Sequence, residues 1–151
     1  MKAKLRYREC QALVNVGAGQ ERGRPGGEES ILRALPVVGG RARQEPGMAG
    51  SLYKQAIPLA NPTRKPGEWQ AYDIVWTAPT FNDDGSVKTP AYATVFFNGV
   101  VVENHFELKG QTLYIGKPFY KAYTSAPIKL QAHGDKSEPI SFRNIWIREL
   151  N

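Results

Sequence analysis

A single histidine near the end of a predicted strand is the residue best suited to do chemistry in this sequence. Side chains of a strand alternate between two faces, so within residues 128–133 one face carries Lys129, Gln131 and His133. This row places an imidazole, which can act as a general base or a metal ligand near neutral pH, beside two hydrogen-bonding groups. The alternative is a surface strand that ends in a histidine before a Gly-Asp turn and has no chemical role.

The second histidine, His105, follows Glu103 and Asn104 at the end of another predicted strand. Two histidines far apart in sequence do not make a metal site without carboxylate partners. We therefore interpret His105 as a solvated strand end. Asn104 stays a candidate for hydrogen bonding to a ligand.

The predicted C-terminal strand, residues 140–150, carries an arginine and a tryptophan that could serve a site. We expect Ile145 and Ile147 to be buried, which leaves Trp146 on the other face. Regular alternation directs Arg143 inward with the isoleucines, unless a β-bulge shifts it.

The sequence lacks the motifs of several common enzyme classes. It contains no G-x-S-x-G nucleophile motif, no phosphate-binding loop and no paired-cysteine zinc spacing. Ordinary glycoside hydrolysis needs two facing carboxyl groups, and Asp73, Asp83 and Asp84 show no partner at a recognisable spacing. These absences fit either a base-driven mechanism or no catalysis.

The elements that must position these residues are predicted to be β-strands. In residues 69–77, Tyr72, Ile74 and Trp76 alternate with their neighbours at the period of a strand packed on one face. This phase predicts Trp76 to be in the core. Further strands are predicted at residues 51–57, 112–115, 128–133 and 140–150.

The clearest turn signal is Asn98-Gly99, which separates β-branched and aromatic residues at 93–97 and 100–102. Both turn residues readily take φ > 0, so a two-residue hairpin with a type I′ turn is predicted. Short strands with turns between them, and no helical pattern after residue 47, predict an all-β, antiparallel, jelly-roll-like β-sandwich.

The first 46 residues have a different composition from the rest. They contain one aromatic residue, Tyr7, and several glycines beside arginine and proline, so they bury too little to offset their ordering entropy. We expect residues 1–46 to be a poorly ordered or non-homologous leader, and residues 47–151 to form the domain.

The net charge of +6 divides into +4 for residues 1–46 and +2 for the remainder. Without an interleaved basic and aromatic patch, nucleic-acid binding is not predicted. The single cysteine, Cys10, excludes an intramolecular disulfide. The N-terminal residues contain no apolar run long enough for a membrane span or a signal peptide.

Several segments, taken in order, resemble one family. They are KPGEWQAYDIVWTAP, FNDDGSVKTPA, TVFFNGVVVEN, ELKG, YIGKP, KLQAHGD and FRNIWIREL. Residues 47–151 are thereby similar to the 3-keto-disaccharide hydrolase-like domains. The resemblance implies a concanavalin-like jelly roll, found mostly in exported bacterial proteins, that cleaves glycosidic bonds of sugars oxidised at C3.

The resemblance also implies roles for individual residues. A C3 ketone acidifies the proton at C2, so His133 would be the base that removes it and starts elimination of the glycosidic oxygen. Lys54, Arg143 or a divalent metal ion would hold the ketone oxygen. The remaining sugar contacts would come from Asn104 and Gln131 by hydrogen bonding and from Trp146 by stacking.

Two departures from the family favour a second hypothesis. The family has an aspartate directly before the histidine where this chain has Ala132, and residues 1–46 lack the family's segment of Glu, Gln and Asp. An incomplete sandwich would then be a carbohydrate-binding domain without catalysis. Oligomeric state and the compartment of this chain are left open by the sequence.

Overall fold

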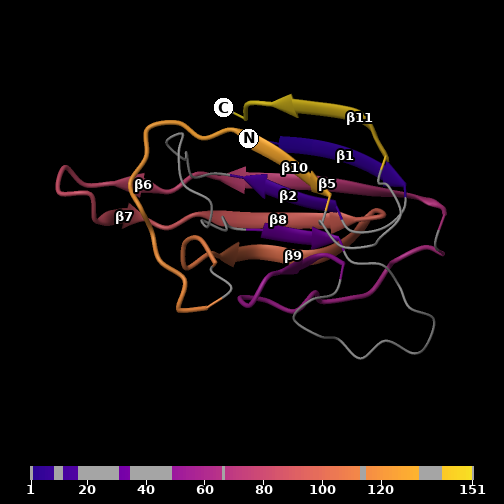
Figure 1. The fold of residues 1–151 in the computed structure, drawn as a ribbon, viewed down its shortest axis with the longest axis horizontal. Helices are drawn as coiled ribbons and strands as arrows, with labels where there is room; N and C mark the ends of the chain where they lie inside the picture. Colours follow the sequence, from indigo (N-terminus) through magenta and orange to yellow (C-terminus); the bar gives the residue numbers. More distant parts are fainter. Residues whose placement is uncertain are drawn as a thin grey trace.

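A computed structural model describes the backbone of residues 2–8, 12–16, 31–34, 49–65, 67–112, 115–132 and 141–150. Side chains are described within these ranges from residue 49 onward, apart from those of residues 129, 131 and 132. In the described residues all regular elements are β-strands, and every pairing between strands is antiparallel (Figure 1). The predicted all-β class is thus confirmed for this part of the chain.

The strands form two main sheets and one small hairpin. Sheet A has the order β11-β1-β5-β8-β9 and consists of β1 (Lys2–Arg8), β5 (Trp69–Thr77), β8 (Tyr92–Phe97), β9 (Val100–Glu107) and β11 (Ser141–Arg148). Sheet B has the order β10-β2-β3-β4 and consists of β2 (Ala12–Val16), β3 (Ile31–Ala34), β4 (Ser51–Leu52) and β10 (Ile128–Ala132). The hairpin pairs β6 (Thr80–Phe81) with β7 (Val87–Thr89).

Three of these strands lie within residues 1–46, for which the sequence predicted little structure. Strand β1 pairs with β5 on one side and with β11 on the other, and β2 pairs with β10. The division of the chain at residue 46 stays a prediction.

The core lies between the two sheets. Sheet A contributes alternate residues of β5 and β8, namely Tyr72, Ile74, Trp76, Ala93, Val95 and Phe97, and the buried row of β5 matches the predicted phase. Sheet B contributes Leu52, and the half-buried Ile128 packs against the same cluster. Because residues of one strand face alternately in and out, these buried rows define the inner face of sheet A and leave the other rows on its outer face.

The β8–β9 hairpin forms as predicted. Asn98 has φ 50° and Gly99 has φ 83°, the conformation that a type I′ turn requires. The Asn98 side chain also binds neighbouring segments: its Oδ1 accepts from the Ala71 amide at 2.9 Å, and its Nδ2 donates to the Pro62 carbonyl at 2.9 Å and to Gln70 Oε1 at 2.6 Å. The turn is therefore fixed to β5 and to the loop before it.

The strand predicted at 51–57 is shorter than expected. Only Ser51–Leu52 is extended, because Lys54 takes φ 58° and turns the chain back. The amides of Gln55 and Ala56 then both donate to the Leu52 carbonyl, at 2.8 and 2.9 Å. The prediction of a regular strand here was wrong, because a left-handed lysine has no signature in the sequence.

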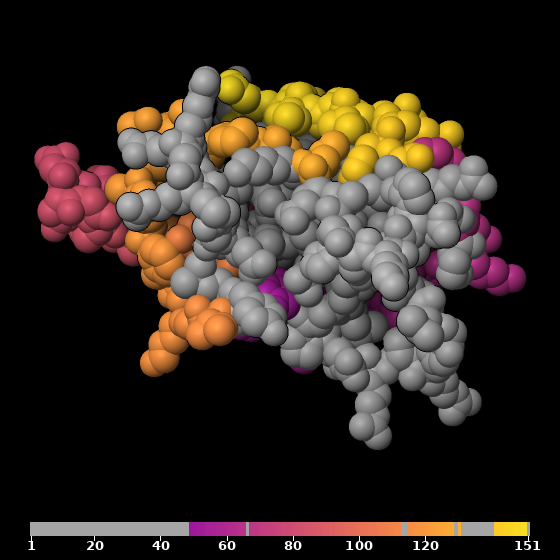
Figure 2. Space-filling view, viewed as in Figure 1, coloured from indigo at the N-terminus to yellow at the C-terminus, as the bar shows by residue number. Residues whose placement is uncertain are grey.

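One end of the sandwich carries the β6–β7 hairpin, which projects from the body (Figure 2). Its tip is the predicted polar turn, closed by the Asn82 amide donating to the Ser86 carbonyl at 2.9 Å. A loop packs against the base of the hairpin, where Tyr123 meets the Phe81 ring edge-on at 5.4 Å. The Tyr120 hydroxyl anchors this loop by donating to the Leu108 carbonyl and accepting from the Ala91 amide at 2.8 Å.

The same loop approaches the segment after β9 very closely at Gly110. The Gln111 amide donates to the Phe119 carbonyl at 2.8 Å, and the Phe119 amide donates back at 3.2 Å. Gly110 has φ 101°, and a Cβ atom built there would lie 2.1 Å from the Phe119 carbonyl oxygen. Only glycine fits this contact.

Candidate functional site

The outer face of sheet A is the described surface on which predicted site residues come together. On β5 it carries Trp69, Ala71 and Asp73, which are half-buried and alternate with the core residues. On the neighbouring β8 it carries Thr94 and Phe96, also half-buried. Aromatic rings beside a carboxylate and a hydroxyl form a surface suited to a saccharide.

Arg143 and Trp146 of β11 share this outer face. The register aligns Arg143, through β1, with Ala71, and aligns Trp146 in the same way with Asp73. Residues directly opposite one another in antiparallel strands point to the same side, so both columns continue onto the outer face. The sequence had foreseen this placement of Arg143 only if a bulge intervened, and the pairing of β1 with β11 contains that irregularity.

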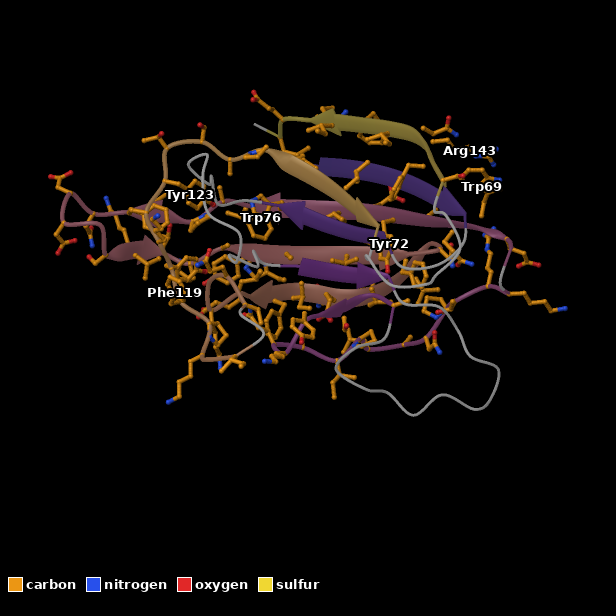
Figure 3. The ribbon with its side chains drawn as sticks, in the orientation of Figure 1. Trp69, Tyr72, Trp76, Phe119, Tyr123 and Arg143 are labelled. Atoms are coloured by element: carbon orange, nitrogen blue, oxygen red, sulfur yellow. The ribbon has the colours of Figure 1, made fainter. Side chains whose placement is uncertain are left out.

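The guanidinium of Arg143 lies over the indole ring of Trp69, with 3.7 Å between the Arg143 Cζ atom and the ring centroid (Figure 3). A cation at this distance is attracted by the ring quadrupole, and the two planar groups stack. This contact between Trp69 and Arg143 was not predicted from the sequence.

The isoleucines of β11 are less buried than predicted. Ile147 lies in the column of Ile74, on the inner side, yet it is 51% exposed, and Ile145 is 48% exposed. Strand β11 is at the edge of sheet A, so among the described strands only β1 lies beside it. The prediction that both isoleucines are buried was wrong.

Asn104 and Lys54 lie on the opposite side of the sandwich from β11. Asn104 is exposed on β9, four strands across sheet A from β11, a separation of roughly 19 Å. Lys54 is exposed in the turn after β4, with its ammonium 5.6 Å from the centroid of the Tyr53 ring. The described structure does not bring these two residues next to Arg143 and Trp146.

Gln55, next to Lys54, stabilises the loop after β9 by hydrogen bonds. Its Nε2 donates to the Gly110 carbonyl at 3.0 Å and to Thr112 Oγ1 at 2.7 Å, and its Oε1 accepts from the Lys109 amide at 2.8 Å. With both ends of the amide engaged, Gln55 serves the fold.

His133 and the side chain of Gln131 lie outside the described residues. Strand β10 ends at Ala132, and the half-buried Ile128 packs against the core, whereas Leu130 of the same row is 37% exposed. In Figure 1 β10 runs toward the end of the sandwich at which β11 begins. Strand β10 therefore leads toward the end of sheet A where Arg143 lies.

His105 is exposed, as expected of a strand end, but it is not isolated. Its imidazole stacks on the Tyr92 ring, with centroids 4.4 Å apart and planes within 4°. The Tyr92 hydroxyl donates to Glu107 Oε2 at 3.1 Å, and this hydrogen bond raises the pKa of Tyr92. Tyr92 pairs with Thr77, eight residues along β5 from Trp69, so the cluster lies roughly 26 Å from the Arg143 stack.

Glu103 is a buried acid that sequence reasoning did not single out. An ideal two-residue hairpin would pair Val95 with Val102 and leave Glu103 on the outer face. The observed register instead pairs Val95 with Glu103, whose side chain is 3% exposed on the inner face. Its Oε1 has no hydrogen-bond partner among the described residues, and burial raises its pKa to about 8. The carboxyl group is thus neutral at neutral pH.

A divalent metal does not fit the residues that the structure describes. No three His, Cys, Asp or Glu side chains among them are grouped closely enough to hold an ion. We therefore derive no step through a metal. Within the same residues, no helix is long and apolar enough to cross a membrane.

Comparison with known proteins identifies relatives at two levels. Residues 27–148 match the 3-keto-alpha-glucoside-1,2-lyase-like domain. Among solved structures, the chain is similar to a "putative glycosyl hydrolase" from Parabacteroides distasonis, with 44% sequence identity and a TM-score of 0.80. The alignment covers 99% of this chain and 63% of that one, so this chain spans less than two thirds of the length of that protein. A search of the curated proteins gave no match.

Proposed function

Since the chain belongs to the 3-keto-alpha-glucoside-1,2-lyase-like domain family, as its motifs predicted, we propose that it cleaves the glycosidic bond of sugars that carry a ketone at C3. The observation that supports this most directly is the family match over residues 27–148, together with 44% identity to the solved relative. The jelly-roll topology predicted from sequence belongs to the same proposal.

The chemistry starts at C2 of the sugar. The neighbouring ketone stabilises an enolate, so His133, acting as a base, removes the C2 proton. The electron pair of the enolate then forms a C1–C2 double bond as the C1–O bond breaks, and the leaving oxygen takes up a proton. Addition of water across the new double bond would complete a net hydrolysis.

Cations and aromatic groups would hold the sugar during this reaction. Arg143 offers a planar set of N–H donors for the ketone oxygen, which gains negative charge in the enolate. Trp146, on the same outer face, offers an apolar ring for the C–H surface of a pyranose. Lys54 stays a prediction for the ketone oxygen, and Gln131 and Asn104 stay predictions for hydrogen bonds to the sugar.

The test is incubation of the purified protein with a 3-keto-disaccharide and, separately, with its unoxidised parent. We expect cleavage of the keto sugar alone, because only the ketone acidifies C2. Replacement His133→Ala should lower the rate by roughly 10²- to 10⁴-fold. The matched control is His105→Ala, which removes the only other histidine, at the far end of the sheet. Equal cleavage of both sugars, or full activity of His133→Ala, would refute this mechanism.

The second candidate function is carbohydrate binding without turnover. It is favoured by Ala132, which stands where the family has an aspartate, and by the lack of a grouped acidic set among the described residues. Saturable binding of the keto sugar, with no product after long incubation, would select this alternative. In that case Trp146→Ala should weaken binding, whereas His133→Ala should leave binding unchanged.

A further inference from the structure

We propose that Asn144 and Trp69 are positioning residues, which together turn Arg143 out of the core and hold its guanidinium ready for the sugar. This inference rests on the proposed function for its purpose, but its geometry stands on separate observations. These are the register of β11, the backbone angle at Asn144 and the contact between Arg143 and Trp69.

The register shows what a regular strand would do. Ile147 lies opposite Ala3, and Ala3 lies opposite the buried Ile74, so the Ile147 column is on the inner face. In an uninterrupted strand Arg143, four residues away, would point to that same face. A guanidinium there would be directed toward the inner face of the sheet, where the hydrophobic core lies.

An extra residue in β11 prevents this. The pairs Trp146 with Lys4 and Arg143 with Arg6 leave two residues of β11, Asn144 and Ile145, opposite a single residue of β1. Such a bulge reverses the facing of every residue beyond it. Arg143 therefore joins the column of Ala71, on the outer face with Trp146.

The bulge depends on the residue type at position 144. Asn144 has φ 54°, in the left-handed region that glycine and asparagine tolerate and β-branched residues avoid. Glycine should therefore preserve the bulge, and valine should favour an extended backbone that removes it. The sequence marks this position only by an asparagine within an otherwise strand-like run.

Trp69 fixes the side chain once the backbone has directed it outward. The Arg143 Cζ atom stacks 3.7 Å from the centroid of the Trp69 ring, which lies at the first position of β5. One face of the guanidinium is thereby covered, whereas its N–H groups, which lie in the guanidinium plane, stay available at the edges. A planar set of N–H donors, held in place by stacking on a ring, is suited to donate hydrogen bonds to a ketone or hydroxyl oxygen of a sugar.

The first test measures geometry without any sugar. Stacking on an indole shifts the side-chain proton resonances of Arg143 upfield by the ring current, so NMR spectra report the contact directly. We expect the shift to persist in Asn144→Gly and to vanish in Asn144→Val and Trp69→Leu. Circular dichroism and thermal unfolding establish which variants are folded. If Asn144→Val does not fold, Trp69→Leu still tests the contact, because it does not alter the sequence of β11. A persistent shift in folded Asn144→Val would overturn the role of the bulge.

The second test measures affinity for a 3-keto-disaccharide by titration calorimetry. Arg143→Ala, Asn144→Val and Trp69→Leu should each weaken binding by about tenfold or more, and Asn144→Gly and Trp69→Phe should stay within about threefold of the parent. In the Arg143→Ala background, Asn144→Val should cause no further loss, because its effect acts through that arginine. Additive losses would overturn the inference.

The outcomes separate this inference from the proposed function. If the parent protein neither binds nor cleaves the keto sugar, the proposed function fails, and the ring-current test still decides the geometry. If the parent binds the sugar but Asn144→Val and Trp69→Leu bind it equally well, the proposed function survives and the positioning role is refuted.

Discussion

The two edge strands of sheet A use the same local device with opposite results. Each is irregular against its neighbour, with one register shift on β11 and two on β9, and each has one non-glycine residue with positive φ, His105 on β9 and Asn144 on β11. On β9 the register shift at Val102, separate from the one beside His105, leaves two successive residues, Val102 and Glu103, buried. On β11 it turns a charged residue outward.

The difference lies in what covers each edge. The segment after β4 runs along β9, where the Leu59 amide donates to the Val102 carbonyl at 2.8 Å and Gly50 packs against the Val102 side chain. Among the described residues no comparable segment crosses β11. A bulge thus changes the face of the sheet to which side chains point, but the segments that pack over the strand determine whether those side chains are buried or exposed.

Of the residues at the two edges, Glu103 on β9 is predicted to have the largest effect on stability. Its pKa in the folded protein is about 8 against an ordinary value of 4.5, so between these values the folded state keeps a proton that the unfolded state has lost. Raising the pH across this window therefore favours unfolding, by on the order of 3 kcal/mol between pH 5 and pH 8.5. Denaturant titrations across this range should show the loss in the parent protein.

Replacement Glu103→Gln should remove this pH dependence and make the protein more stable than the parent at pH 8.5. Glu107→Gln, an exposed glutamate on the same strand, is the control and should retain the parent's pH dependence. If Glu103→Gln follows the parent's pH profile, Glu103 does not titrate as a buried acid, and the contrast between the two edges loses its main support.

A smaller effect is expected at the turn that begins β9. Asn98→Ala removes three side-chain hydrogen bonds and places alanine at φ 50°, so we expect a loss of about 2–3 kcal/mol in the free energy of unfolding. Asn98→Gly tolerates the backbone angle and should lose less, about 1–2 kcal/mol. Urea unfolding of both variants separates the two contributions, and losses below about 0.5 kcal/mol in both would show that the turn does not anchor this edge.

The smallest effect is expected on β11. Ile147→Ala should cost about 1 kcal/mol, because the side chain is 51% exposed. Ile74→Ala is a matched control in the same register column, and at 1% exposed it should cost about 2–5 kcal/mol. Equal losses of unfolding free energy, measured by chemical denaturation, would mean that Ile147 on β11 is buried to the same extent as Ile74 at the centre of the sheet.

The parts of the fold that follow regular alternation were predictable from sequence. The buried row of β5, the type I′ hairpin and the extent of the C-terminal strand follow from side-chain period and from one Asn-Gly pair. The inward Glu103 was missed because an ideal hairpin register points it outward. The turn at Lys54 was missed because its backbone angle is set by the Leu52 carbonyl, which accepts two amides.

The candidate site was predictable in composition more than in arrangement. Arg143 and Trp146 were predictable as site residues, and the strand period directs Arg143 inward unless a bulge intervenes, but nothing in the sequence locates that bulge. The contact of Trp69 with Arg143 was not predicted, since a contact between the first residue of β5 and a residue of β11 depends on sheet order. The role of His133 stays a prediction, because that residue lies outside the described part of the chain.

The close approach at Gly110 has a consequence for how this sequence can vary in evolution. The carbonyl oxygen of Phe119 occupies the space that a side chain at position 110 would need. No other amino acid can therefore replace the glycine unless the loop of Phe119 and Tyr120 moves as well. That loop is held in turn by hydrogen bonds to Leu108 and Ala91. A substitution at position 110 therefore requires a simultaneous change in the facing loop, so this position is closed to stepwise change.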